Sequence, residues 1–271
     1  MGRLGLKVSD DLTSAVEWEL QRVQLCRLAP IRALATLEEA ELFLHDRGML
    51  TLTADSALPS LFGATHEQPF AQGKLGFGAY PKTKWWWGGA LGQLPGVVPT
   101  KLHRGKTLLL SQRVARLADP LCRTEVAAAA SGELGESCRQ IVEHLESAGP
   151  SLLEELKDEI GLDARTLRTA RQKLEARGAV SSASVRLATK SGSHIHSSRL
   201  ARWDQLVPAS QATAAEALAE LVVAGVQAAV VAPRAELARW FAWRVDAPII
   251  DGLVASGRLR AVGESLAAST P

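Results

Sequence analysis

The chain has 271 residues and a formal net charge of +2, with 46% hydrophobic and 22% charged residues. This composition excludes general disorder, and no apolar run reaches the roughly 20 residues that a membrane helix requires. Residues 1–30 lack an uninterrupted apolar stretch and the three cysteines are widely spaced, so we expect a cytoplasmic protein without a signal peptide, disulfide framework or paired-cysteine metal site.

Residues 1–53 form the first predicted unit. Thr36 and Glu39 have the spacing of a capping box, which predicts a helix that ends at Gly48. Residues 49–53 then alternate as a strand does. Because that helix is acidic, we do not expect it to face an anionic partner.

Residues 54–125 form an insert rich in glycine and proline. From residue 68 to residue 118 it has no aspartate or glutamate, although it carries eight lysines and arginines with aromatic residues among them. Cations neutralise phosphates and rings stack on bases, so the segment predicts a nucleic-acid surface. The residues expected to contact nucleic acid here are Lys74, Lys82, Lys84, Trp86, Lys101, His103, Arg104 and Lys106.

The three consecutive tryptophans of the insert also fit a structural role. Buried tryptophans are common in cores, so we expect at least one of the three to be buried. Strand-like alternation would place Trp85 and Trp87 on one side and Trp86 on the other.

Residues 97–111 have the pattern of two strands joined at His103-Arg104-Gly105-Lys106. A basic hairpin tip fits a nucleic-acid groove or an extruded nucleotide, although a solvated turn would have the same sequence.

Residues 126–207 form the second predicted unit. A first helix over residues 137–148 is expected to stop at Gly149-Pro150. Ser151 with Glu154 predicts a capping box for a second helix, and Asp163 predicts the cap of a third.

The third helix of this unit has two faces. Leu167, Ala170 and Leu174 recur on the inward side, and basic or polar residues recur on the opposite side. Gly178 then ends the helix, and a strand, a turn at residues 190–192 and a return strand follow. A solvated face would also be basic, but a third helix in this position is the one presented to the major groove. The expected DNA contacts are Arg165, Arg168, Arg171, Gln172 and the turn residue Lys190.

Residues 208–271 form the last predicted unit. An alanine-rich helix precedes a short strand at residues 228–231, and Pro233 suits the first turn of a second helix. Asp246 and Pro248 open a third helix, and a strand covers residues 258–262. That third helix has no basic residue, so we expect this unit to position the others.

Three segments share the pattern Leu-x-x-x-Gly before an apolar strand: residues 44–50, 174–180 and 253–259. A glycine-ended helix followed by a strand is typical of a winged helix. We therefore predict a mainly α fold with small β wings (α+β), built of three tandem winged-helix units with a β-rich insert between the first and second.

Several motifs keep their order along the chain. They are Gly48-Met-Leu-Thr-Leu, Leu58-Pro-Ser-Leu-Phe-Gly-Ala, Lys84-Trp-Trp-Trp, Lys101-Leu-His-Arg-Gly-Lys and Leu110-Ser111. With them, the sequence from about residue 36 to its end resembles bacterial proteins related to the AlkZ/YcaQ-type DNA glycosylases. The resemblance implies tandem winged helices around double-stranded DNA, excision of alkylated or crosslinked bases, and no metal or organic cofactor.

Catalytic members of that family carry a Gln-apolar-Gln motif near the strand after the first winged helix. The matching position here reads Thr51-Leu52-Thr53, and Asp55 follows. A monofunctional glycosylase needs a polar group that places water against the anomeric carbon. The resemblance therefore makes Thr51, Thr53 and Asp55 the candidate catalytic residues, although Asp55 also fits a turn.

Three hypotheses follow, each with double-stranded DNA as the partner and none with a cofactor. The first is a monomeric DNA-binding protein of DNA repair that recognises damaged or distorted duplex. The second is an active monofunctional glycosylase with a changed catalytic motif. The third is a transcription regulator that reads one sequence with its middle unit.

Overall fold

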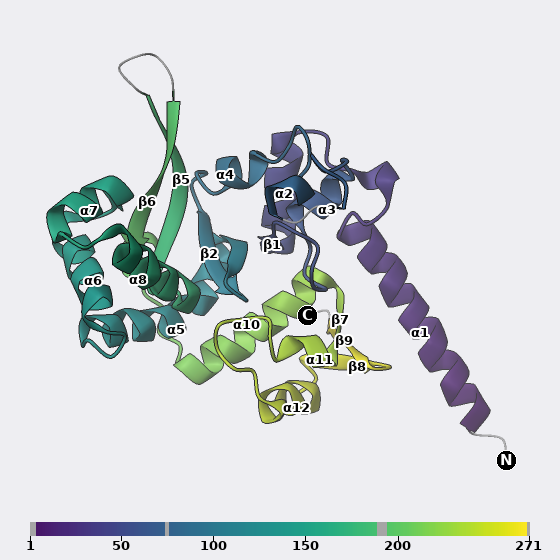
Figure 1. The fold of residues 1–271 in the computed structure, drawn as a ribbon. Helices are drawn as coiled ribbons and strands as arrows, with labels where there is room; N and C mark the ends of the chain where they lie inside the picture. The colour runs from purple at the N-terminus through teal and green to yellow at the C-terminus, as the bar shows by residue number, and fades with distance from the viewer. Residues whose placement is uncertain (1–3, 74–75, 189–193, 270–271) are drawn as a thin grey trace. The chain divides into compact units, whose positions relative to one another are not determined.

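The computed structural model describes residues 4–73, 76–188 and 194–269, and the chain folds into two compact units (Figure 1). The terminal unit comprises residues 1–88, 219–240 and 244–271, and the central unit comprises residues 89–218 and 241–243. The structure is α+β, as predicted at that level. Within the described ranges, no helix combines the length and apolarity needed to cross a bilayer.

The central unit combines helices with two antiparallel hairpins. Its elements in chain order are β2 (Val97–His103), β3 (Lys106–Ser111), α5 (Gln112–Ala130), α6 (Glu136–Ala148), β4 (Ser151–Leu152), α7 (Leu153–Ile160), α8 (Ala164–Arg177), β5 (Val180–Ala188), β6 (His194–Arg202) and α9 (Trp203–Leu206). Helices α4 (Trp87–Leu91) and α10 (Ala214–Ala229) each carry the chain between the units.

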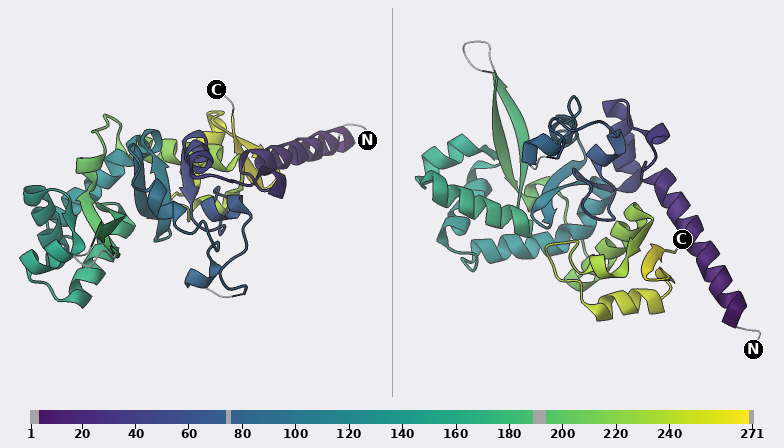
Figure 2. Two further views of the ribbon diagram at one scale, coloured as in Figure 1. Left: turned by 90° about the horizontal axis from the view of Figure 1, so that it is seen from above. Right: turned by 45° about the vertical axis from the view of Figure 1, so that its right-hand side comes forward.

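The longer hairpin of the central unit is a ribbon beside the helices. β5 and β6 pair antiparallel from Val180↔Arg202 to Ala188↔His194, and β4 adds to β6, which gives the strand order β4-β6-β5. Figures 1 and 2 show the two strands projecting from helices α6, α7 and α8. The ribbon packs against these helices and also against β2, where the Ser181 hydroxyl donates to the Pro99 carbonyl (2.6 Å).

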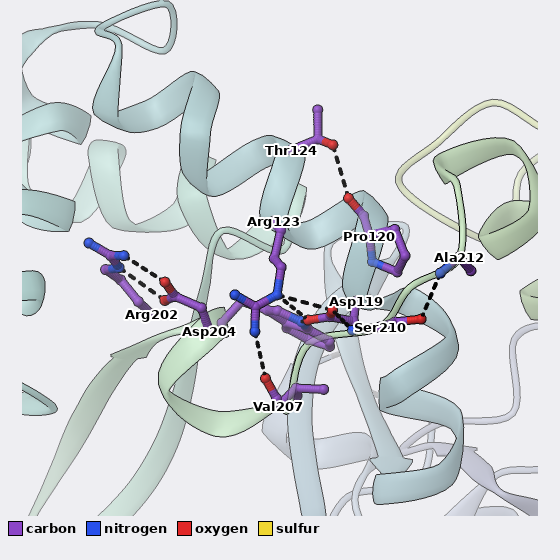
Figure 3. Close-up of polar contacts among 10 residues, drawn as sticks. Asp119, Pro120, Arg123, Thr124, Arg202, Asp204, Val207, Ser210 and Ala212 are labelled. Carbon is purple, nitrogen blue, oxygen red and sulfur yellow. Dashed lines mark hydrogen bonds and ion pairs between the residues drawn. The ribbon is translucent and has the colours of Figure 1, made fainter.

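A buried carboxylate joins separate segments of the central unit (Figure 3). Asp119 of α5 is fully buried and accepts hydrogen bonds from the Arg123 guanidinium (2.8 Å) and the Ser210 backbone N–H (2.7 Å). The indole N–H of Trp203 donates a further bond over 3.0 Å. Burial of a carboxylate is costly unless its lone pairs are satisfied, and three donors satisfy this one.

The terminal unit is built from both ends of the chain. Its elements are α1 (Leu4–Leu25), η1 (Pro30–Arg32), α2 (Leu37–Arg47), β1 (Met49–Thr51), α3 (Leu61–Thr65), η2 (Gly76–Ala79), β7 (Val231–Pro233), α11 (Arg234–Leu237), α12 (Ala247–Ala255), β8 (Leu259–Val262) and β9 (Ser265–Ala268). The last three strands form a sheet of order β7-β9-β8, and Ala15 and Trp18 of α1 pack against its apolar side chains.

The helix ends follow the predicted caps. The Thr36 side chain accepts a bond from the Glu39 backbone N–H (3.2 Å), and Asp163 accepts from the first turn of α8. Gly48 and Gly178 end their helices with φ of 80° and 81°, a left-handed conformation that favours glycine. These boundaries were predictable because a cap depends on neighbouring residues only.

Two predicted helix starts are wrong. Ser151 does not cap α7: it lies in β4, and the helix begins after Leu152, whose N–H donates to the Glu155 carboxylate over 2.7 Å. Pairing of Ser151 with Leu200 of β6 draws that residue into the sheet. Pro233 lies at the end of β7, one residue before α11, and not in its first turn.

Three predicted strands or alternations also differ. Residues 228 and 229 belong to α10, so the strand is Val231–Pro233 rather than residues 228–231. β1 stops at Thr51, before residue 53. Trp85 and Trp86 lie in a turn before α4, so no strand-like alternation exists there, although Trp87 is buried as expected.

Candidate nucleic-acid interface

Helix α8 is fixed at both ends by its own sequence. The Asp163 carboxylate accepts bonds from the backbone N–H groups of Arg165 (2.9 Å) and Thr166 (3.0 Å). The Thr166 hydroxyl also donates to it, and these bonds lower the pKa of Asp163. The cap is therefore charged at neutral pH, where it also complements the helix dipole.

The two faces of α8 divide as the sequence predicts. Leu167, Ala170 and Leu174 are buried in the central unit. Arg165, Arg168 and Gln172 are exposed, and their side chains make no hydrogen bond or ion pair with any described residue. Their spacing of three and four residues places them along one stripe of the helix. The guanidinium groups of Arg165 and Arg168 and the amide of Gln172 are thus exposed, without a hydrogen bond or ion pair to any other described residue.

Arg171 takes a different role from its neighbours on α8. It is half-buried, and its Nε lies 3.6 Å from the Glu175 carboxylate. Glu175 is buried and also accepts a bond from the Ser182 hydroxyl of β5. Arg171 therefore belongs to a polar contact between α8 and the ribbon.

Lys101 of β2 is also drawn inward. Its Nζ donates a 2.6 Å hydrogen bond to the Thr107 hydroxyl, on the other strand of the hairpin. Burial lowers the pKa of Lys101, as does Arg171, while Glu175 opposes the shift. Lys101 thus lies in the same electrostatic neighbourhood as α8, although 70 residues of sequence separate it from Arg171.

The tip of the β2–β3 hairpin is the turn that the sequence predicts. Arg104 and Gly105 both have left-handed backbones, with φ of 53° and 71°, and His103 pairs with Lys106. Arg104 and Lys106 are exposed, whereas the His103 side chain is fully buried. The hairpin tip therefore carries two exposed cationic side chains, whereas the His103 imidazole is inside the fold.

The β5–β6 ribbon carries basic residues that sequence reasoning did not select. Arg186 is exposed on β5 opposite His196 on β6, and His194 is exposed at the start of β6. The period-2 alternation of these positions along the strands was a signal that could have found them. Lys190, the residue that was selected, lies outside the described residues.

Among the predicted nucleic-acid contacts of the terminal unit, some side chains are exposed and one is bonded within the fold. Lys82 is exposed, as is Trp86, while Lys74 lies outside the described residues. The Nζ of Lys84 donates to the Leu34 carbonyl (3.1 Å) and lies 5.3 Å from the centre of the Trp87 ring. Lys84 is therefore engaged within the terminal unit, whereas the Lys82 side chain is exposed.

The candidate catalytic residues lie at the end of β1 and in the loop after it. Thr51 is buried, and its hydroxyl lies within hydrogen-bond distance of the carbonyls of Thr53 (3.0 Å) and Pro59 (3.3 Å). Thr53 and Asp55 are half-buried, and the Asp55 backbone N–H donates to the Thr53 carbonyl (3.0 Å). The Thr51 hydroxyl is thus directed at the backbone of the same loop.

The fold is similar to that of the Streptomyces sahachiroi DNA glycosylase AlkZ, with a TM-score of 0.52 over 92% of this chain and 68% of that chain. The two sequences are 15% identical. No family model matches the sequence, and no curated protein matches it. The chain therefore has the fold of the DNA glycosylase AlkZ, which confirms the resemblance to AlkZ/YcaQ-type DNA glycosylases at the level of the fold.

Proposed function

We propose that this chain is a DNA-binding protein of DNA repair that recognises damaged or distorted double-stranded DNA. In this proposal residues 1–53, 126–207 and 208–271 are three winged-helix units, and residues 54–125 are the insert between the first two. The chain acts as a monomer. The similarity to AlkZ, a DNA glycosylase, supports DNA as the partner.

The order of elements in residues 126–207 supports the winged-helix assignment. Helices α6, α7 and α8 precede the β5–β6 ribbon, which is the order helix, helix, recognition helix, wing. In this assignment α8 enters the major groove and the ribbon lies along the DNA backbone.

One observation carries the proposal: the exposed stripe of Arg165, Arg168 and Gln172 on α8. Arginine donates to guanine edges or phosphates, and glutamine bonds adenine, so this residue set suits a groove. A helix face that only needed solvation would gain from carboxylates placed one turn away from the arginines, and this stripe has none.

A triple variant tests the assignment. Replacing Arg165, Arg168 and Gln172 by alanine keeps a good helix former at each position, so α8 is expected to stay folded. We expect affinity for duplex DNA to fall by at least about tenfold at about 0.1 M salt, since each contact with a base or a phosphate contributes to the free energy of binding. Fluorescence anisotropy with a labelled duplex measures this change.

Arg139→Ala is the matched control. Arg139 lies on α6 of the same unit, and Glu136 and Glu143 hold its guanidinium at 2.6 Å each. Its loss removes a surface charge without touching the α8 stripe. Equal affinity of the triple variant and this control would contradict a groove-binding α8.

Base excision is a second candidate function, favoured by the fold shared with a DNA glycosylase. Because the Thr51 hydroxyl faces backbone carbonyls, we assign activation of water to Asp55, which carries the only carboxylate among Thr51, Thr53 and Asp55. Release of free base from alkylated duplex should then be lost in Asp55→Asn and kept in Thr51→Val. If the unmodified chain releases no base from alkylated or crosslinked DNA, this second function is refuted and the binding function stands.

A further inference from the structure

Five aromatic rings gather on the terminal unit in a cluster that no part of the proposed duplex contact uses. Phe70, Phe77, Tyr80 and Trp85 contact one another through Phe77, and Trp86 follows Trp85 in the chain with its ring against Trp87; we call these five the ring cluster. The Phe70 and Phe77 rings stack with centroids 4.7 Å apart at 24°, and Phe77 meets Trp85 edge-on at 5.4 Å. Tyr80 also lies edge-on to Phe77, at 5.7 Å.

Four of the five rings of this cluster lie at the surface. Phe77 is 55% exposed and Trp86 47%, with Phe70 at 39% and Trp85 at 37%. Large aromatic side chains stabilise a protein most when they are buried, so several exposed rings in mutual contact indicate a binding surface.

Two of the five rings also contact buried rings. Tyr80 contacts the buried Phe62 ring at a centroid distance of 5.2 Å, and Trp86 contacts the buried Trp87 ring edge-on at 6.4 Å. The group of four contacting rings is therefore held by Phe62, and Trp86 is held separately by Trp87.

Backbone hydrogen bonds join the two described stretches that carry the rings, residues 68–73 and 76–86. The N–H of Phe70 donates to the Tyr80 carbonyl over 2.8 Å, and that of Ala71 donates to the Gly78 carbonyl over 2.9 Å. The N–H of Lys82 closes the same segment at the Gln68 carbonyl (3.1 Å). Rings on an ordered backbone lose little conformational entropy when they bind.

The charges around the cluster favour an anionic partner. Between residues 62 and 118 the sequence has one carboxylate, Glu67. That carboxylate accepts bonds from the Thr83 N–H (2.9 Å), the Thr83 hydroxyl (2.7 Å) and the Lys84 N–H (3.2 Å), so its charge is held within the fold. Lys82 is exposed nearby in sequence. The surface thus combines rings with positive charge.

We propose that the ring cluster is a second DNA site that stacks on unpaired bases, such as those of a single strand or a bulge. Base-aromatic stacking works with every base because each has a π face, and a neighbouring lysine attracts the phosphates. The inference rests on the proposed function for its partner, DNA, and adds unpaired bases to the duplex contacts of α8. The scarcity of carboxylates between residues 62 and 118 favours an anionic partner over an apolar protein surface.

The test compares two double variants on two probes. Phe77→Leu with Trp86→Leu keeps apolar bulk and removes stacking, whereas Phe77→Tyr with Trp86→Phe keeps both rings. The probes are a labelled single strand of about 20 nucleotides and the fully paired duplex of the same sequence. Thermal unfolding of all proteins checks that the variants fold.

We expect the leucine variant to lose about tenfold or more in single-strand affinity, with duplex affinity within about twofold of the unmodified chain. The ring-keeping variant should bind the single strand as the unmodified chain does. Trp86→Phe alone should also reduce the quenching of tryptophan fluorescence that the single strand causes.

Three results would overturn the inference. The first is unchanged single-strand binding by the leucine variant, and the second is equal loss in both double variants. The third is self-association of the unmodified chain in sedimentation that the leucine variant abolishes, which would make the cluster a protein contact. If the chain binds duplex but no single strand, only this inference fails; if it binds neither, the proposed function fails with it.

Discussion

The indole N–H of Trp203 donates a 3.0 Å hydrogen bond to the Asp119 carboxylate, although 84 residues separate the two in the sequence. Both side chains are fully buried. The same carboxylate receives the Arg123 guanidinium and the Ser210 N–H, so it joins α5, α9 and the segment that leads to α10 (Figure 3). Asp119 is therefore the buried polar residue that holds these three segments of the central unit together.

Replacement of Asp119 by alanine should destabilise the protein by about 3–5 kcal/mol, because it leaves the buried Trp203 indole N–H and the Ser210 N–H without their acceptor and removes the ion-pair partner of Arg123. Urea unfolding measures the change. Arg116→Ala is the control: Arg116 is exposed on the same helix, and its loss should change stability by less than about 0.5 kcal/mol. A stability of Asp119→Ala equal to that of the control would contradict this account of the central unit.

Gly178 ends α8 under two constraints that can be separated. Its φ of 81° favours glycine, and a Cβ there would lie 2.8 Å from both Cys122 Sγ and Leu102 Cδ2. Gly161, with φ of 72°, has the first constraint only, since nothing lies within 4 Å of its Cβ position. We expect Gly178→Ala to cost about 2–4 kcal/mol and Gly161→Ala about 1 kcal/mol in unfolding free energy. Equal losses of unfolding free energy in the two variants would contradict a steric constraint at Gly178.

The cysteines should be unreactive in the folded protein. Burial raises the pKa of Cys26 to about 11 and raises that of Cys122 as well, so both stay protonated near pH 8, where the thiolate is the reactive form. Iodoacetamide at pH 8 should leave both unmodified in the native protein and alkylate them in urea, as read by mass spectrometry of peptides. Rapid native labelling of either thiol would contradict the buried positions.

The raised pKa of Cys26 also makes the stability of the protein depend on pH. A thiol whose pKa is raised on folding contributes stability in full below the pKa of the unfolded thiol. That contribution declines as the pH rises from there toward about 11 for Cys26. The urea midpoint should therefore fall over this range, and Cys26→Ala should fall less steeply than the unmodified chain.

The β2–β3 hairpin should contribute to DNA binding through charge. Arg104 and Lys106 are exposed at its tip, so changing both to glutamine should reduce the slope of log affinity against log salt by up to about 2. Lys101→Gln is the control on the same hairpin, because the Lys101 ammonium is already bonded to Thr107. A salt slope unchanged in the double variant would exclude the hairpin tip from the phosphate contacts.

Short-range signals predicted much of the fold. Asp163, Thr36 and Gly178 mark helix ends correctly because a cap depends on residues within one turn. The Ser151 prediction failed since strand pairing with Leu200, a residue 49 positions away, decides the conformation there. The Asp119 contacts could not be predicted for the same reason: their partners meet only in the folded chain.

The candidate interface shows the same division. Helical spacing placed Arg165, Arg168 and Gln172 on the exposed face of α8. The same spacing could also have paired Arg171 with Glu175, four residues on. It could not show that His103 is buried, because that depends on packing between elements. The aromatic residues of the insert were visible in the sequence, but their contacts as one surface cluster were not.

Affinity for an intact duplex and for the same duplex with a helix-distorting abasic site, measured over a range of salt concentrations, tests the central claim most directly. The account predicts affinity that falls linearly on a log–log plot against salt and tighter binding of the distorted duplex at every salt concentration. Equal affinity for the two duplexes would contradict recognition of distorted DNA, and the absence of salt-dependent binding to either would contradict DNA binding itself.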